Sequence, residues 1–226
     1  MFLNCKTWFS YRYGTFTTKE LVDTASEIGL SSLGLTNINS TADLWDFVDF
    51  CRNKNIKPIA GAEIRNGDEL CYLLLAKSDA GLLEINRFLS MHLQEELPFP
   101  ERPDCFSEVF VIYPVGKYAA GELKNHEFIG VLAGELNRLK KQELQAFPKK
   151  WLIRHPVTVQ NKTYFNVHRL LRAIGKNTLI TKLGATDFAS PDEMFMPEAE
   201  LMAAFRNHPV MITNTLQLPT FLLSGM

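Results

Sequence analysis

The chain has 226 residues, of which 46% are hydrophobic and 22% are charged, and its formal net charge is -1. A chain of this length can bury a substantial core as one domain. The near-neutral charge argues against a dedicated nucleic-acid-binding module, which usually carries a clustered basic surface.

The cysteines form no Cys-x-x-Cys pair, and no signal peptide precedes the first expected strand. We therefore expect reduced thiols and a cytoplasmic location. The apolar stretch at 209–223 is interrupted by Asn214, Gln217 and Pro219. It is a poor membrane span, so no membrane partner is expected.

Strand-like and helix-like segments alternate from the N-terminus. Alternate side chains of a strand share one face, so Asn4 and Lys6, at the end of the first expected strand, point into the same site. A helix begins at Thr17, which stands three residues before Glu20 as in a capping box, and it ends at Gly29.

The rest of the chain continues the alternation. The Asn-Gly dipeptide within 65–68 lies between two apolar runs and predicts a hairpin turn. Strands are expected at 32–36, 56–64, 69–77, 108–114, 127–133 and 151–159. Helices are expected at 40–55, 79–95, 134–147, 164–175, 197–207 and 210–218. This order predicts an α/β fold with a mainly parallel sheet, open or closed.

Three long stretches of the sequence carry a family resemblance. They are LNCKTWFSYRYGTFTTKELVDTASEIGLSSLGLTNINSTADLWDFVDFCRNKNIKPIAGAEI, YLLLAKSDAGLLEINRFLS and DEMFMPEAELMAAFRNHPVMITNT. The chain resembles the PHP (polymerase and histidinol phosphatase) domain, in the version found at the N-terminus of bacterial C-family DNA polymerase III alpha subunits. The resemblance implies a distorted (β/α)7 TIM-like barrel over 1–226, with 208–226 resembling the start of the connection to a polymerase palm domain.

The departures from the family pattern fall on its metal ligands. Asn4 and Lys6 stand at the family's first histidine pair, and Asn37 and Ile38 stand at its Asp-His pair. Tyr13 stands at an aspartate of the family pattern, and Cys71 stands at a histidine. The family's later Asp-x-His is missing from 157–163. By resemblance, the vestigial metal-site positions are Asn4, Lys6, Tyr13, Asn37, Ile38, Glu63 and Cys71.

The replacements remove the electron-pair donors that a metal needs. Divalent metals bind neutral imidazoles and carboxylates, whereas an ammonium has no lone pair to offer and isoleucine offers none. We therefore expect no metal, no cofactor and no catalytic residue in this chain. We predict instead that Lys6 forms an ion pair with Glu63, because a buried carboxylate without a partner is costly.

Other polar groups favour ordinary structural roles. Asp43, Asp46 and Asp49 recur at i, i+3 and i+6 of the helix expected at 40–55, and no histidine joins them. We interpret them as a solvent-exposed helix face and not as a cation site. The histidines are scattered without a pair at ligand spacing, so none is expected to bind metal.

The leading interpretation is a catalytically inactive, structural PHP domain of a DNA polymerase III alpha subunit-like protein. The parent protein would be a DNA-directed DNA polymerase that uses magnesium in replication or repair synthesis. Its other domains would be the partners of this chain, which would meet DNA only indirectly.

Two alternatives stay open. One is a freestanding phosphoesterase that uses zinc or manganese at a shifted site built from Glu63, Cys71 and a nearby histidine. The other is an independent interaction module derived from the polymerase. At the C-terminus, we predict that Phe221, Leu222 and Leu223 either fold back on the barrel or are buried in a homodimer.

Overall fold

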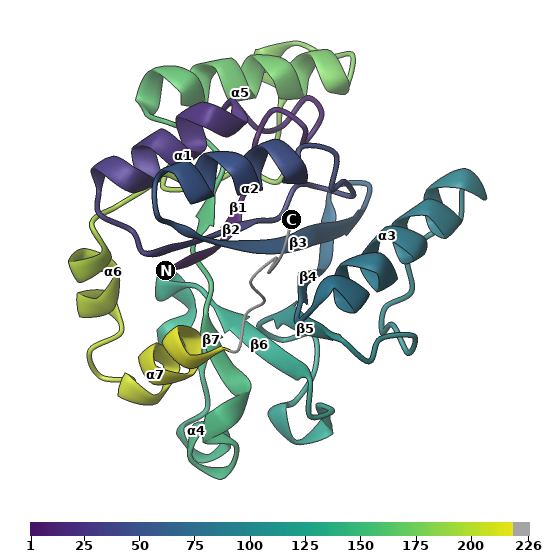
Figure 1. Cartoon of the computed structure of the whole chain (residues 1–226). Coiled ribbons are helices and arrows are strands. Elements are labelled where there is room, and N and C mark those ends of the chain that lie inside the picture. The colour runs from purple at the N-terminus through teal and green to yellow at the C-terminus, as the bar shows by residue number, and fades with distance from the viewer. Residues whose placement is uncertain (219–226) are drawn as a thin grey trace.

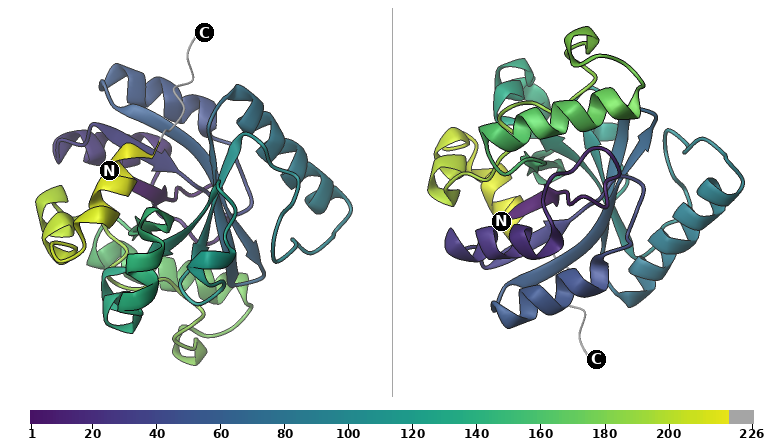
Figure 2. Two further views of the ribbon diagram at one scale, coloured as in Figure 1. Left: turned by 90° about the horizontal axis from the view of Figure 1, so that it is seen from below. Right: turned by 90° about the horizontal axis from the view of Figure 1, so that it is seen from above.

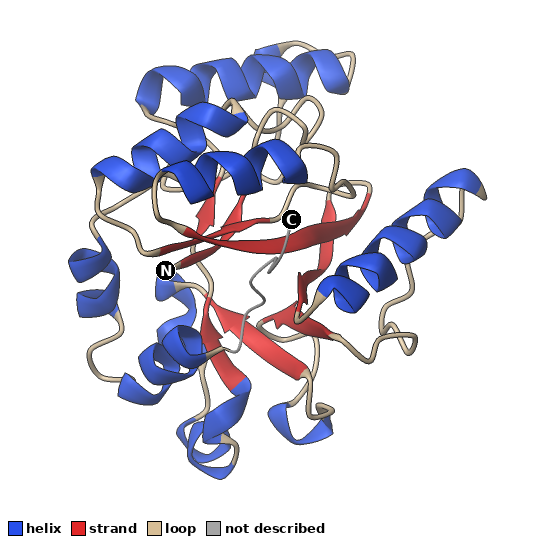
Figure 3. Ribbon diagram, in the orientation of Figure 1, coloured by secondary structure: helices blue, strands red, loops and turns tan. Residues whose placement is uncertain are grey.

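The centre of the molecule is a curled eight-stranded sheet, seen in a computed structural model that describes residues 1–218. The strands follow the order β7-β6-β5-β4-β3-β2-β1-β8, and the helices lie on the outer side of the sheet (Figure 1; Figure 3). The strands are β1 Phe2–Cys5, β2 Ser32–Leu35, β3 Lys57–Asn66, β4 Glu69–Ala76, β5 Val109–Pro114, β6 Glu127–Val131, β7 Trp151–Ile153 and β8 Pro156–Val157.

The α-helices follow the strands along the chain. They are α1 Thr18–Glu27, α2 Leu44–Asn53, α3 Asp79–Gln94, α4 Lys141–Ala146, α5 Lys162–Gly175, α6 Glu198–Ala204 and α7 Pro209–Gln217. Short 3₁₀ helices are η1 Ala120–Glu122, η2 Ala133–Arg138, η3 Pro148–Lys150 and η4 Ile180–Lys182. Figure 2 shows the sheet from its two ends, with α5 lying across the end that is seen from above.

Strand pairing is parallel except around β4, which runs antiparallel to both β3 and β5. The hairpin between β3 and β4 is the one that the Asn-Gly dipeptide predicts, and Gly67 adopts a φ of +60° in its turn. A positive φ is accessible to glycine without the steric penalty that a Cβ atom causes. The mainly parallel sheet therefore contains one reversed strand.

The two edge strands of the sheet are consecutive in the chain. β7 pairs with β6 and β8 pairs with β1, and only Arg154 and His155 separate them. The segment predicted as one strand at 151–159 is thus split into two short strands that belong to opposite edges. Counted as one bent strand, β7 and β8 complete the distorted (β/α)7 TIM-like barrel that was expected.

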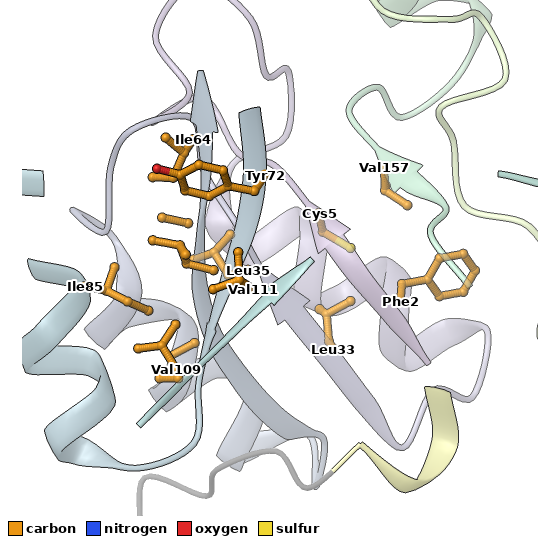
Figure 4. Close-up of a cluster of buried hydrophobic side chains, with 14 of the residues drawn as sticks. Phe2, Cys5, Leu33, Leu35, Ile64, Tyr72, Ile85, Val109, Val111 and Val157 are labelled. Atoms are coloured by element: carbon orange, nitrogen blue, oxygen red, sulfur yellow. The ribbon is translucent and has the colours of Figure 1, made fainter. Parts of the chain in front are cut away.

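Apolar side chains fill two regions, one on each face of the sheet. The larger cluster lies between the strands and the helices and includes Leu33, Tyr72 and Val111 (Figure 4). The smaller cluster is formed almost entirely by strand side chains, including Leu3 and Leu73, and fills the concave face. Consecutive strand residues alternate between these faces, which is why the strands are apolar throughout.

The start and end signals of the first helix are confirmed. The Thr17 hydroxyl accepts a hydrogen bond from the Glu20 backbone N–H, and the Glu20 carboxylate accepts one from the Thr17 backbone N–H. Gly29 follows the helix with a φ of +74°. Both observations are the expected consequence of unsatisfied backbone groups at helix ends.

The helix predicted at 134–147 is wrong as one continuous element. The structure has η2 and α4 instead, separated by the extended residues Leu139 and Lys140. Leu136, Leu139 and Leu144 are partly buried against the main core, so packing fixes the backbone here. Helix propensity in a segment of this length is too weak to override such contacts.

The C-terminal part of the chain is described only as far as Leu218. Helix α7 packs near β7, where the Asn214 amide donates hydrogen bonds to the Pro148 and Trp151 carbonyls. Leu218 joins the concave-face cluster. The predictions for Phe221, Leu222 and Leu223 fall on residues 219–226, which lie outside the described residues. Within 1–218, no helix is long and apolar enough to cross a membrane.

We predict that Gly61→Ala destabilises the barrel by about 1–3 kcal/mol, the usual cost of overpacking. A Cβ atom at Gly61 would lie 2.2 Å from the Leu74 carbonyl oxygen and 2.8 Å from Leu75 Cδ2. Urea unfolding measures the free energy. Gly134→Ala is the matched control, since no atom lies within 4 Å of its added Cβ. Equal stability of the two variants would contradict the close approach of β3 and β4.

Candidate functional site at the barrel mouth

A buried polar cluster lies where the parallel strands end. Lys6 directly follows β1, Thr36 and Asn37 follow β2, and Glu63 lies within β3. Thr158 follows β8 and is also buried. In (β/α) barrels the functional site is built at this C-terminal end of the strands, so we call this region the barrel mouth.

Glu63 is the centre of the cluster. Its carboxylate accepts hydrogen bonds from Lys6 Nζ at 2.7 Å, Asn4 Nδ2 at 2.7 Å and Arg65 Nε at 2.6 Å. The side chains of Lys6 and Glu63 are each only 1% exposed. The predicted Lys6–Glu63 ion pair is therefore confirmed, and Asn4 and Lys6 do point into one site.

Two cations hold Glu63 ionised in spite of its burial. Burial alone would raise the pKa of this carboxyl, but the charges of Arg65 and Lys6 and the hydrogen bonds from Lys6 and Asn4 lower it to about 2. Burial would likewise lower the pKa of the Arg65 guanidinium, and the charge of Glu63 outweighs it and raises that pKa. Glu63 and Arg65 therefore each favour the ionised state of the other.

Tyr13 occupies the position where the resemblance implies an aspartate. Its ring packs under two guanidinium groups, with the Arg65 carbon 4.5 Å and the Arg172 carbon 5.1 Å from the ring centroid. Its hydroxyl accepts a hydrogen bond from Arg65 at 3.3 Å. Burial raises the pKa of Tyr13 to about 12, so the phenol is neutral at physiological pH.

His168 on α5 packs against Tyr13, and both of its ring nitrogens form hydrogen bonds. Its ring meets the Tyr13 ring edge-on, with centroids 4.7 Å apart. Nδ1 lies 2.6 Å from the Tyr13 carbonyl oxygen, and Nε2 accepts a hydrogen bond from the Ala189 backbone N–H at 2.8 Å. These partners require Nδ1 to carry the proton, and burial lowers the pKa of the imidazole.

Asn37 belongs to a second, adjoining network. Its Oδ1 accepts hydrogen bonds from the Thr7 backbone N–H at 2.8 Å and from the Ser10 hydroxyl at 2.8 Å. Its Nδ2 donates to Asp43 Oδ1 at 2.7 Å. Asp43 Oδ2 also accepts from the hydroxyls of Thr7 and Thr18. The network ties the loop after β1 to the start of α2.

The interpretation of Asp43 as part of a solvated helix face is therefore wrong. Asp43 precedes α2 and is 2% exposed, whereas Asp46 and Asp49 are exposed as expected. At the N-cap position its carboxylate turns away from the helix and toward the barrel mouth. The i, i+3, i+6 spacing does not distinguish a residue inside a helix from the one that precedes it.

Ile38 and Cys71 do not contribute polar atoms to the cluster. Ile38 is half-buried, forms an isolated β-bridge with Glu63 and donates its backbone N–H to the Ser10 hydroxyl at 3.0 Å. Cys71 lies at a β-bulge and joins the helix-side core, while Glu63 pairs with Leu73 of the concave face. Burial raises the pKa of the Cys71 thiol.

The segment 157–163, where the family's Asp-x-His was expected, is held by a different carboxylate. Thr158 Oγ1 donates to Glu193 Oε2 at 2.5 Å, and the backbone N–H groups of Thr158 and Val159 both donate to the Glu193 carbonyl oxygen. Within residues 1–218, no three His, Cys, Asp or Glu side chains gather where they could hold a metal ion.

The site also contains polar residues that were not predicted from the sequence. Arg65 follows Glu63 by two positions on one strand, so period-two alternation could have placed both on the same face. No local signal identifies the contribution of Asp43, Ser10 or Thr18. Their role depends on long-range contacts between the loop after β1 and the start of α2.

The comparison with protein families decides the class of this barrel. The model of the PHP domain matches residues 3–177, which include all of α5 and the β1–β8 sheet except for Phe2. The chain belongs to the PHP domain family. The mouth of a PHP barrel here carries Lys6 and Arg65 against Glu63.

Two curated proteins resemble part of this PHP domain. They are the DNA polymerase III subunit alpha of Neisseria meningitidis serogroup A and that of serogroup B, each 32% identical over 94 residues. The match covers 39% of this chain and 8% of each relative. The likeness is therefore to a small part of a much longer protein.

We predict that Glu63→Gln lowers the free energy of unfolding at pH 7 by about 3–5 kcal/mol, because it leaves buried cations without a carboxylate. Chemical denaturation measures the loss. Glu69→Gln is the matched control, since the Glu69 side chain is 73% exposed and lies 3.6 Å from Lys117. Adding Lys6→Met to Glu63→Gln should restore part of the stability. Additive losses in the double variant would contradict the direct pairing.

The pH dependence of stability should report on the same carboxylate. The pKa of Glu63 is about 2 in the folded chain against an ordinary value of 4.5, so its ionised form favours folding. This contribution is complete above the ordinary value and is lost as the pH falls from 4.5 toward 2. The stability difference between the wild type and Glu63→Gln should be constant near neutral pH and shrink below about pH 5. A difference unchanged down to the acid transition would contradict this assignment.

Proposed function

We propose that this chain is a catalytically inactive, structural PHP domain of a DNA polymerase III alpha subunit-like protein. The observation that carries the proposal is the Lys6 ammonium, which lies 2.7 Å from Glu63 at the barrel mouth. An ammonium at that distance occupies the electron pairs of the carboxylate that a metal ion would use. The positions Asn4, Lys6, Tyr13, Asn37, Ile38, Glu63 and Cys71 are then vestiges of a metal site.

The donor set at the mouth does not fit a PHP metal centre. Lys6 and Arg65 carry positive charge and offer no lone pair, and a divalent cation beside them would be repelled. His168 uses both ring nitrogens in hydrogen bonds. Asn4 retains one unpartnered amide oxygen, Oδ1, which is a single weak donor. No catalytic step is assigned to these residues.

A structural role is supported by what the polar cluster connects. The Glu63 and Asn37 networks link β1, β2 and β3 with the start of α2, and Tyr13 links them to α5. These polar groups would thus hold the barrel together. The partial likeness to two polymerase alpha subunits supports a parent protein engaged in cytoplasmic DNA synthesis, with its other domains as partners.

The proposal predicts that the purified chain binds no stoichiometric metal and hydrolyses no phosphate ester. The protein is incubated with manganese, zinc or magnesium, passed through a desalting column, and analysed for metal by mass spectrometry. Hydrolysis of bis(p-nitrophenyl) phosphate and of a 3′-labelled single-stranded oligonucleotide is measured in parallel. We expect well under one ion per chain and no turnover above the metal-only blank.

Two variants separate the possible outcomes of this experiment. Turnover that is lost in Glu63→Gln and kept in the control Glu69→Gln would establish the phosphoesterase alternative and overturn the proposal. Tightly held metal that is lost in Cys71→Ser would favour the shifted site. Unfolding curves recorded with and without metal provide an independent reading, because a metal bound to the folded state raises stability.

A further inference from the structure

A groove of about 750 Å³ lies on the outer surface beside the C-terminal half of α5. Its apolar lining comes from Leu170 and Ile174 on α5 and from Leu179 and Ile180 in the segment that follows. These side chains are 47%, 54%, 63% and 36% exposed, in the same order. We call this feature the α5 groove.

Helix α5 buries polar residues and exposes apolar ones, which is the reverse of an ordinary surface helix. Its buried residues include His168 and Arg172, which face the polar barrel mouth, whereas Leu170 and Ile174 are exposed. A surface helix normally buries its apolar stripe and exposes its polar face. Contiguous exposed apolar side chains on a protein surface mark interaction sites more often than isolated ones do.

The charged residues beside the groove are mostly basic. Residues 162–182 contain no Asp or Glu. The charged residues there are Lys162, Arg169, Arg172, Lys176 and Lys182. Arg172 and Lys176 are paired with Asp68, and Lys176 also pairs with Asp187. Lys182 lines the groove and takes part in none of the ion pairs found within residues 1–218.

The loop after β1 extends this surface toward the barrel mouth. A Cβ atom built on Gly175 would lie 3.3 Å from Arg12 Cδ, so the Arg12 side chain lies against the end of α5. The Arg12 guanidinium lies 4.8 Å from the ring centroid of Tyr11, which is 76% exposed. Tyr and Arg are the residue types that most often dominate binding energy at protein interfaces.

We propose that the α5 groove binds an acidic amphipathic helix of a partner protein. The apolar face of that helix would cover Leu170, Ile174 and Leu179, and its carboxylates would meet Lys182 and Arg12. Helix-in-groove recognition uses this combination of an apolar seam and flanking charges. The inference does not depend on whether the barrel is catalytically inactive.

Charge and shape distinguish this occupant from two others. A twofold dimer through the groove would place Lys182 and Arg12 of one copy near the same basic surface of the second, which is unfavourable. A membrane surface takes a protruding amphipathic face, whereas the apolar residues here line a hollow. A partner helix with acidic flanks fits both observations.

A designed peptide pair tests the proposal. The probe is a fluorescein-labelled 18-residue helix (a length of about five turns) with leucine at i, i+3, i+4 and i+7 and glutamate at the other positions. In the matched peptide, lysine replaces every glutamate. Fluorescence anisotropy with the full chain should give saturable binding of the acidic peptide, at least about tenfold tighter than that of the basic peptide. Added salt should weaken the binding.

Surface variants locate the binding. Ile174→Ser combined with Leu179→Ser should raise the dissociation constant about tenfold or more, and Lys182→Glu should weaken the acidic peptide while strengthening the basic one. Leu93→Ser is the matched control, because Leu93 on α3 is 52% exposed and lies outside the groove lining. Melting curves check that each variant is folded.

Other outcomes would overturn the inference. The first is the absence of saturable binding of the acidic peptide. The others are equal affinity for both peptides and an equal loss of binding in Leu93→Ser. Light scattering that shows a dimer which Leu179→Ser dissociates would assign the groove to a second copy. Flotation with anionic phosphatidylglycerol vesicles, reduced by the same substitution, would assign it to a lipid surface.

Discussion

The structure depends on how one buried carboxylate is compensated. Glu63 is 1% exposed, and an ionised carboxylate in such a position is stable only with close positive partners and hydrogen bonds. Asn4 on β1, Lys6 directly after β1 and Arg65 on β3 supply these. In the metal-binding members that the family resemblance implies, metal ions would provide the positive charge. Here the charge is part of the chain.

The positive charge comes from side chains of the protein itself, and this affects how the rest of the barrel mouth is built. Arg65 donates a hydrogen bond to Glu63 through Nε and another to the Tyr13 hydroxyl through Nη2. Tyr13 then meets His168 and Arg172 from α5, so the compensation of one carboxylate extends to the helix that crosses the barrel mouth. The polar residues of the barrel mouth are thus connected to one another by hydrogen bonds and ring contacts.

The sequence predicts those features that depend on neighbours along the chain. The Thr17–Glu20 capping box and the turn at Gly67 are local, and both are present. The Lys6–Glu63 pair was also predictable, because the family pattern places both residues at one site. The PHP barrel itself followed from ordered motifs and from the alternation of strands and helices.

Features that depend on tertiary contacts were not predictable in the same way. Asp43 and the hydroxyl of Thr7 are separated by 36 positions, and nothing in either local segment indicates their hydrogen bond. The break at Leu139 also reflects contact with the core, because the surrounding residues favour a helix. Local propensity fails where burial of distant groups sets the backbone.

The barrel mouth and the α5 groove have a common physical origin. A helix that covers a polar site must turn polar side chains inward, and α5 presents His168 and Arg172 to Tyr13 and to Asp68. Because polar residues occupy the inner face of α5, Leu170 and Ile174 lie on its outer face. The polar residues that α5 turns toward the barrel mouth therefore leave apolar residues on its outer surface. Removing such a surface from water is favourable, so contact with another chain would lower its free energy.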